Sequence, residues 1–461
     1  MSDRRALHVV LALLALLLAA GLWRVCAAVG LEVPLDPNEG WNAYHAAAAM
    51  GGGPLYPGPH SYMINNYPPL SFYFVGGIGL LVGDNIIAGR IVSLVSLGAL
   101  AVGLYLAARR MGCRRDVSAL PPLLFAGGLL LFTDYVGMND PQMLAEAVAV
   151  AGFAILLSEP RTPWTVAGAA ALFALAVFVK HNVVALALAA SVWLLLHDRR
   201  GALRLVACGL GLFLAGLMIF RLVYGTGLLA QIVTARSYSL DNLIGGVSRW
   251  LRWSLIPLVG LAALAVRYRR DRYVQLCAVT ATIGTLIGVA LLGGTGVDPN
   301  VLFDADIALA LAAALLIERL GGRRAAAAAA YAAPLLFAAA TNADWRDGAS
   351  WRHPMRDEAA MARDDIAFLA RRPGPAICEM PSFCYWANKP AAVDVFNIGQ
   401  AFETGARSDA ELTRQIEARR FAAIQFDPDS PYSLGDNVHN AVARAYRLDH
   451  ADDYGAFYVR K

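Results

Sequence analysis

Long apolar runs constrain this chain more than any other feature. The 461 residues are 58% hydrophobic and only 16% charged, whereas a typical soluble domain is about 25% charged. A run of about 20 apolar residues can cross the bilayer core as a helix. Backbone groups in lipid must satisfy their own hydrogen bonds, and the sequence lacks the alternating segments of a membrane barrel. The sequence therefore predicts an α-helical polytopic membrane protein.

Basic residues predict the topology, because loops rich in Lys and Arg stay in the cytoplasm. Residues 31–89 contain no Lys or Arg, so we expect this segment on the outer side. The apolar run 68–83 then lies in or against the outer interface. We expect about eleven crossings, at residues 6–29, 86–108, 117–136, 141–158, 164–180, 182–197, 203–224, 254–267, 273–293, 301–318 and 325–341.

The same reasoning places the N-terminus in the cytoplasm and the C-terminus outside, and we expect the membrane to be a bacterial inner membrane. The first apolar run is too long for a signal peptide and is expected to remain as a span. The net charge of +4 is spread over short loops. No basic patch forms, so no nucleic-acid partner is expected.

The composition changes after residue 342, where charge rises and apolar runs become short. We expect residues 1–342 to form the membrane domain and residues 343–461 a small periplasmic α/β domain. Its predicted elements are strands at 375–379, 421–427 and 454–459, a helix at 409–420 capped by Ser408, and a helix at 438–446.

Two cysteines lie close together in this C-terminal segment. Cys378 and Cys384 can form a disulfide if the segment lies outside the cytoplasm, and two ordinary thiols fit the sequence equally well. Their spacing does not match a zinc site.

The predicted outer loops contain the unusual polar residues. The first loop has an acidic start, Asp36-Pro37-Asn38-Glu39-Gly40-Trp41, and later reads Gly53-Pro54-Leu55-Tyr56 and Tyr67-Pro68-Pro69-Leu70. The second contains Asp140 before Pro141. Asp36 and Asp140 also suit helix caps, and Glu39 suits a first helical turn, so structural roles remain open for all three.

This ordered set of motifs resembles the GT-C glycosyltransferases over roughly residues 6–310. It is most similar to the bacterial relatives of the protein-mannosyl and aminoarabinose transferases (family 39-like). Further matching pieces are Ala88-Gly89-Arg90, Asp140, Lys180-His181-Asn182 and the segment 296–304. Two positions depart from the family pattern. Asn38 stands where the family has the Asp of an Asp-Glu pair, and Tyr67 replaces a Lys that some relatives carry.

The resemblance implies an inverting transfer of a sugar from a polyprenyl phosphate to an acceptor hydroxyl on the outer face. A carboxylate takes the hydroxyl proton, and cations hold the departing phosphate. Asp36 or Glu39 is the expected base, and Asp140 is expected to orient that base or the acceptor. The expected substrate contacts are Tyr67, Lys180, His181, Arg236, Arg249, Asn300 and Asp304.

The expected partners are the polyprenyl-phosphate sugar donor, membrane lipid, and a lipid, glycan or protein acceptor. The carboxylates are compatible with a divalent metal, but no ligand spacing requires one. Two alternatives remain. A transporter or flippase would show inverted repeats and interrupted helices at the bilayer midplane. A non-catalytic scaffold would not bring Asp36, Glu39 and Asp140 together.

Overall fold

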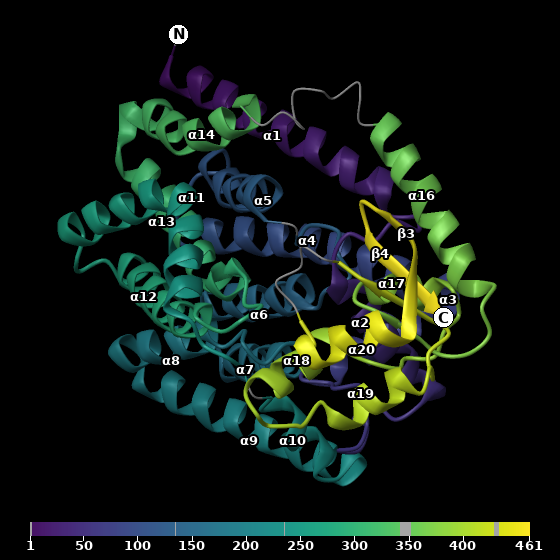
Figure 1. Cartoon of the computed structure of the whole chain (residues 1–461). Coiled ribbons are helices and arrows are strands. Elements are labelled where there is room, and N and C mark those ends of the chain that lie inside the picture. The colour runs from purple at the N-terminus through teal and green to yellow at the C-terminus, as the bar shows by residue number, and fades with distance from the viewer. Residues whose placement is uncertain (1, 134, 235, 342–351, 428–432) are drawn as a thin grey trace.

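The computed structural model of the chain is mostly helical, with a small sheet near its C-terminus (Figure 1). It describes residues 2–133, 135–234, 236–341, 352–427 and 433–461. The expected domain boundary at residue 342 lies outside these described residues. The chain is a multi-pass membrane protein, because several of its helices are long and apolar enough to cross a bilayer.

Every predicted span contains a helix. Seven helices in the described residues meet the length and hydropathy needed for crossing: α1 (Asp3–Ala28), α4 (Asn85–Arg110), α9 (Arg199–Tyr224), α11 (Leu240–Arg267), α12 (Arg272–Leu292), α13 (Phe303–Arg319) with the turn before it, and α14 (Arg324–Thr341) with the turn before it. The other four predicted spans contain shorter apolar helices: α5 (Leu120–Phe132), α6 (Gln142–Leu156), α7 (Pro163–Val179) and α8 (Ala185–His197).

One predicted boundary is wrong. Helix α11 begins at Leu240, well before the expected start at residue 254. The Ser239 hydroxyl caps it by accepting the amide hydrogen of Asp241 at 3.1 Å. Arg249 and Arg252 interrupt the apolar run, so the sequence obscured the first half of this helix.

Small residues let the helices of the bundle approach closely. Helix α13 lies almost entirely inside and packs against α12, α11 and α5. In α4, a Cβ at Gly103 would lie 2.7 Å from the Val150 side chain of α6. Membrane helices depend on such close packing because lipid provides no hydrophobic drive for their association.

Three shorter helices lie in the predicted outer loops: α2 (Pro37–Ala47), α3 (Leu70–Val82) and α10 (Gly227–Ile232). A π-helical turn, Ala48–Gly52, follows α2. Helix α3 is the apolar run expected at the interface. It starts after two prolines and ends at Gly83, whose φ of +87° suits a glycine at a helix C-terminus. It packs against α2 and α4.

The C-terminal part forms a four-stranded sheet in the order β1-β2-β4-β3. Strands β1 and β2 are parallel, and β4 is antiparallel to its neighbours β2 and β3. The elements are α16 (Arg352–Ala370), β1 (Ala376–Cys378), α17 (Pro381–Trp386), α18 (Val395–Glu403), α19 (Ala410–Glu417), β2 (Ala423–Phe426), α20 (Asp436–Ala445), β3 (Tyr446–Asp452) and β4 (Gly455–Arg460).

The three predicted strands and two predicted helices of this segment are confirmed, with shifted ends. The prediction missed β3, because it is an edge strand whose residues are mostly polar and exposed. The start of α19 is shifted by one residue, with Asp409 directly before it, and Ser408 Oγ accepts the amide hydrogen of Ala410 at 3.3 Å, as expected of a capping side chain. Cys378 and Cys384 form a disulfide between the end of β1 and α17.

The C-terminal part packs on the predicted outer loops of the helical bundle. Helix α17 lies against α2 so closely that a Cβ at Gly40 would come within 2.1 Å of the Ser382 nitrogen. The Tyr44 hydroxyl donates to the Lys389 carbonyl at 2.8 Å, and the Trp386 indole donates to Asp84 at 2.8 Å. These contacts join segments more than 300 residues apart into one wall, seen in Figure 1 where α17 and α18 lie near α2.

Candidate active site

A polar cavity of about 490 Å³ lies where the predicted outer loops meet the C-terminal part. Its walls come from the start of α2, the loops after α2, α7, α10 and α12, and the start of α18. The ionisable residues that line it are Asp36, Tyr67, Tyr135, Lys180, His181, Arg236, Asp298, Glu379 and Asp394. Carboxylates and cations therefore share one water-accessible space.

Asp36 occupies the N-cap of α2 and lines the cavity. Its Oδ1 accepts the amide hydrogen of Asn38 at 2.7 Å, as expected for a capping residue followed by proline. Burial of the carboxyl, reinforced by the neighbouring Asp298 and Asp140 carboxylates, raises the pKa of Asp36 to about 7. A carboxyl with this pKa can exchange a proton near neutral pH.

Glu39 lies one turn further along α2 but does not line the cavity. Its side chain is fully buried, and both carboxylate oxygens are bonded to Arg90 of α4, at 2.8 Å from Nε and 2.6 Å from Nη2. It also accepts the amide hydrogens of Leu35 and Asn139. These four bonds hold the loop before α2 and the loop before α6 against α4.

Gly89 explains how the loop before α6 comes so close to α4. A Cβ at this position would lie 1.7 Å from the side-chain oxygen of Asn139. The Asn139 side chain instead donates to the Glu39 carbonyl at 2.9 Å. The Ala88-Gly89-Arg90 motif therefore provides both the gap for Asn139 and the cation for Glu39.

Asp140 forms a buried ion pair with Lys180 at the end of α7. Lys180 Nζ lies 2.7 Å from Asp140 Oδ1, which also accepts the amide hydrogen of Gln142 at 2.7 Å. The ammonium lies 4.9 Å from the ring centre of Tyr67 and 5.8 Å from that of Tyr135. Asp140 and the two rings thus fix this cation in the cavity wall.

Arg236 and His181 lie in the same wall region. The Arg236 guanidinium stacks 4.5 Å from the ring centre of Phe396 and donates to Asn397 at 3.2 Å. Burial of the imidazole, together with the nearby positive charges of Lys180 and Arg236, lowers the pKa of His181 to about 4. The imidazole is therefore neutral at pH 7 and able to donate one hydrogen bond.

Of the three remaining expected residues, only Asn300 lines the cavity, and Asp304 and Arg249 do not. Asn300 lines the cavity, and its amide donates to Gln142 at 2.9 Å. Asp304 is buried behind the cavity, where it accepts the amide hydrogen of Ala185 at 2.8 Å. Arg249 is exposed on α11, and the structure does not bring it to the cavity.

Several cavity residues escaped the sequence analysis. Asp298 lies in the segment 296–304 that carried part of the family resemblance, so its position offered a signal. Asp394 and Asn397 come from the C-terminal part, where no motif pointed to them. Asp394 accepts a hydrogen bond from the Trp41 indole at 2.9 Å, and burial raises its pKa.

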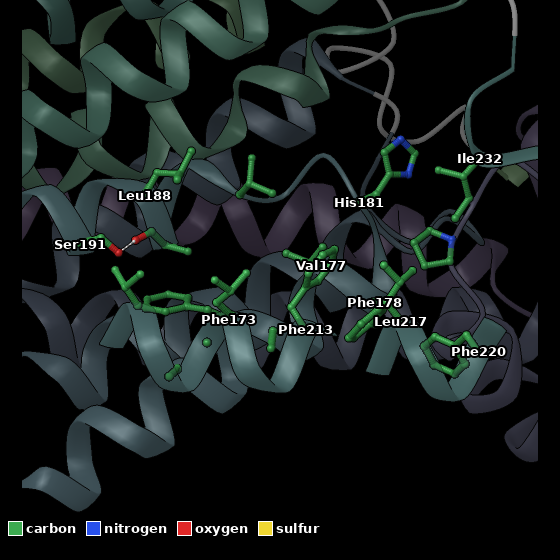
Figure 2. Close-up of a pocket in the computed structure, with 18 of the residues that line it drawn as sticks. Phe173, Val177, Phe178, His181, Leu188, Ser191, Phe213, Leu217, Phe220 and Ile232 are labelled. Atoms are coloured by element: carbon green, nitrogen blue, oxygen red, sulfur yellow. Dashed lines mark hydrogen bonds between the residues drawn. The ribbon is translucent and has the colours of Figure 1, made fainter. Parts of the chain in front are cut away.

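An apolar groove of about 550 Å³ opens beside the polar cavity. Helices α7, α8, α9 and α10 form its walls, which are almost entirely aliphatic and aromatic. Figure 2 shows His181 and Ile232 together at one end and Leu188 and Ser191 toward the other. His181 and Ile232 line both spaces, so the groove adjoins the cavity at these two residues.

The cavity carboxylates do not gather around one point. Within the described residues, no three acidic, histidine or cysteine side chains of the cavity bring their ligand atoms to a common metal-binding distance. The described cavity residues therefore provide neutral and charged hydrogen-bonding groups for a substrate.

The sequence matches a family described as dolichyl-phosphate-mannose-protein mannosyltransferase over residues 66–224, which is less than half of the chain. This segment includes Tyr67, Asp140, Lys180 and His181. No curated protein matches the sequence.

Solved structures with the same architecture extend this comparison to nearly the whole chain. ArnT from Cupriavidus metallidurans in the apo state has a TM-score of 0.62 and 15% identity, covering 97% of both chains. The same protein bound to undecaprenyl phosphate has a TM-score of 0.60 and 14% identity, covering 97% of this chain and 98% of that chain. The Archaeoglobus fulgidus oligosaccharyltransferase tethered to an acceptor peptide has a TM-score of 0.52 and 11% identity, covering 97% and 74%.

The chain therefore has the GT-C fold, and the predicted resemblance to GT-C glycosyltransferases is confirmed. The fold, the family match and the apolar helices together support a membrane glycosyltransferase of this superfamily.

Proposed function

We propose that this protein transfers a sugar from a polyprenyl-phosphate donor to a hydroxyl of a lipid, glycan or protein on the outer face of the bacterial inner membrane. One observation carries the proposal: an apolar groove adjoins a polar cavity that contains both cations and a carboxylate with a pKa near 7. An isoprenoid tail and a charged sugar phosphate need these two surroundings side by side. ArnT, which shares the fold, binds undecaprenyl phosphate.

The donor phosphate belongs at the junction of the two spaces. Lys180 and Arg236 provide positive charge there, and neutral His181 provides a hydrogen-bond donor or acceptor. In the reaction the phosphate leaves the sugar and gains negative charge, so fixed cations stabilise the transition state more than the ground state. Asp140 keeps the Lys180 ammonium in place and is assigned to positioning.

Asp36 is the proposed base. It faces the cavity, whereas Glu39 is held by Arg90 and two backbone amides outside it. The Asp36 carboxylate takes the proton of the acceptor hydroxyl while the oxygen attacks the anomeric carbon and the sugar–phosphate bond breaks. This single displacement inverts the configuration of the sugar. Tyr67, Asn300 and Asp298 line the space left for the sugar and the acceptor.

Two observations support placing the site outside the cytoplasm. The Cys378–Cys384 disulfide suits an oxidising compartment. The loop that contains Asp36 lies in a segment without Lys or Arg, as expected for the outer side.

The test is sugar transfer by the purified protein in lipid nanodiscs. A panel of radiolabelled polyprenyl-phosphate sugars is offered with membrane extract as the acceptor source. We expect Asp36→Asn to lower kcat by roughly 10²- to 10⁴-fold, the typical contribution of a general base. Asn also caps helices well, so this change keeps the start of α2 intact. Asp241→Asn, an exposed carboxylate on α11, is the matched control and should transfer like the wild type.

Transfer that persists in Asp36→Asn would show that the site is wrong. A wild-type protein that transfers no sugar from any donor, but moves the labelled lipid between leaflets, would instead indicate a flippase.

A further inference from the structure

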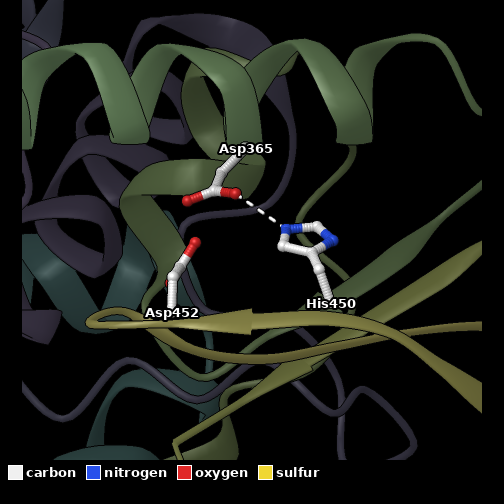
Figure 3. A group of neighbouring side chains, drawn as sticks. All are labelled: Asp365, His450 and Asp452. Atoms are coloured by element: carbon white, nitrogen blue, oxygen red, sulfur yellow. Dashed lines mark hydrogen bonds and ion pairs between the residues drawn. The ribbon is translucent and has the colours of Figure 1, made fainter.

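Three ligand-type side chains meet in the C-terminal part, away from the polar cavity (Figure 3). Asp365 comes from α16, and His450 and Asp452 come from the edge strand β3. His450 and Asp452 are two residues apart on a strand, so they point to the same face. One ligand atom from each of the three residues lies within 4.8 Å of the others.

Asp365 is the buried member of this group, with a side chain only 3% exposed. Its Oδ1 lies 3.0 Å from His450 Nε2. Its Oδ2 is buried and has no hydrogen-bond partner within the described residues. Figure 3 shows this second oxygen directed toward the Asp452 carboxylate. A buried carboxylate oxygen without a donor, facing a second carboxylate, is destabilising unless a proton or a cation lies between them.

The surroundings hold each ligand in one orientation. His450 Nδ1 lies 3.1 Å from Asp449 Oδ2, so Asp449 can hold the hydrogen on this nitrogen while a metal ion replaces the one between Nε2 and Asp365. Asp452 Oδ1 accepts the amide hydrogen of Tyr454 at 2.8 Å. The His450 ring stacks on Phe457, with centroids 4.6 Å apart and planes within 6°. A carboxylate behind a ligating histidine is the usual arrangement at metal sites.

We propose that Asp365, His450 and Asp452 form a divalent metal site that takes Zn²⁺. One imidazole and two carboxylates suit zinc, whereas Mg²⁺ and Ca²⁺ prefer sites made only of oxygen. His450 and Asp452 are partly exposed, which leaves room for a water as the fourth ligand. The bound ion would link α16 to the edge of the sheet. Helix α16 is the first described helix after the membrane bundle and precedes the sheet in the chain. An ion that joins α16 to β3 would therefore help to hold the sheet next to the bundle.

The first test measures zinc binding by the full-length purified protein after treatment with EDTA and removal of the chelator. We expect the wild type to bind one more Zn²⁺ per chain than Asp365→Asn and His450→Ala, by metal analysis. Asp453→Asn changes an exposed neighbouring carboxylate and is the matched control, so it should bind like the wild type. Asp36→Asn should also keep this ion, which separates the site from any metal in the cavity.

Two further measurements guard against variants that fail to fold. Co²⁺ bound to the wild type should show the absorption of a site with a nitrogen ligand, and this signal should be absent in His450→Ala. Asp449→Asn leaves all three ligands in place and should weaken zinc binding by roughly 10- to 100-fold. Equal zinc content and affinity in the wild type, Asp365→Asn and His450→Ala would overturn the proposal. So would a wild type that binds no zinc at micromolar concentrations, because a proton shared by the two carboxylates would then explain the cluster.

Discussion

At the scale of single residues, Asp36 and Glu39 show how one helical turn separates two carboxylates into different roles. They are three residues apart, yet Asp36 lines the cavity, whereas Glu39 forms a buried ion pair with Arg90. The sequence identified both as candidates but left open which one acts. It could not decide, because the partner of Glu39 lies 51 residues further along the chain.

The pKa of Asp36 predicts the pH dependence of transfer. A base must be ionised to accept a proton, and Asp36 ionises near pH 7. We expect the rate to level off above pH 7 and to fall below it, approaching about tenfold per pH unit. Initial rates measured from pH 5 to 9 check this expectation. The fall should disappear from the residual activity of Asp36→Asn, and an unchanged profile in that variant would assign the titration to another group.

Replacing Glu39 is expected to lower the stability of the folded protein. Replacing it by Gln leaves the Arg90 guanidinium buried without its counter-charge, which typically costs about 3–5 kcal/mol. We expect Glu39→Gln to melt at a clearly lower temperature in detergent, as followed by circular dichroism. Asp36→Asn makes the same chemical change three residues away and should melt near the wild type, because Asn keeps the cap. Equal melting of the two variants would contradict the structural role of Glu39.

Residue type and order predicted much of the candidate site. Asp36, Tyr67, Lys180, His181, Arg236 and Asn300 all line one cavity. Arg249 was expected there because its side of the membrane could be inferred, but sequence does not show which face of a long helix turns inward. Asp394 was missed because its link to Trp41 spans 353 residues.

At the scale of elements, α7 and α9 form the groove that we assign to the donor tail. The polyprenyl tail comes from lipid that is as apolar as the groove, so close contacts must provide most of its specificity. The apolar runs predicted these helices, but they did not predict that the facing sides of α7 and α9 leave a groove between them. That gap is a property of how the helices pack, and no local motif marks it.

Filling the groove should weaken use of the donor. A Cβ at Gly209 of α9 would lie 3.9 Å from the Ala170 side chain of α7, and both residues line the groove. We expect Gly209→Phe to raise the KM for a long-chain donor by roughly 5- to 150-fold, since overpacking costs typically 1–3 kcal/mol. Donors whose tails are too short to reach Gly209 should be affected much less.

Gly211→Phe is the matched control on the same helix. A Cβ at Gly211 meets no protein atom within 4 Å, and this residue does not line the groove. Its KM should stay near that of the wild type. Equal effects of the two substitutions would mean that the tail does not bind in this groove.

At the scale of the whole molecule, the membrane bundle and the C-terminal sheet were both predicted from composition. The long apolar runs led to helices in every expected position. The attachment of the sheet to the bundle could not be predicted, because it depends on contacts such as Gly40 against Ser382 that join distant parts of the chain.

Labelling of single added cysteines tests the proposed orientation. We expect Ser408→Cys, exposed before α19, to react with a membrane-impermeant maleimide in cells whose outer membrane is permeabilised. Arg115→Cys, exposed in a basic loop, should react only after the inner membrane is disrupted. The parent protein, which has four free cysteines, gives the background. The reverse pattern would invert the topology.

The cavity and the groove are completed at different points of the chain. The groove is lined by residues between 68 and 232, whereas the cavity also needs Asp394 to Asn397. A nascent chain that ends after α10 therefore contains every residue that lines the groove but lacks part of the cavity wall. On the proposed function, the space for the lipid tail is encoded before the reaction cavity, and transfer requires the last quarter of the chain to be translated and docked.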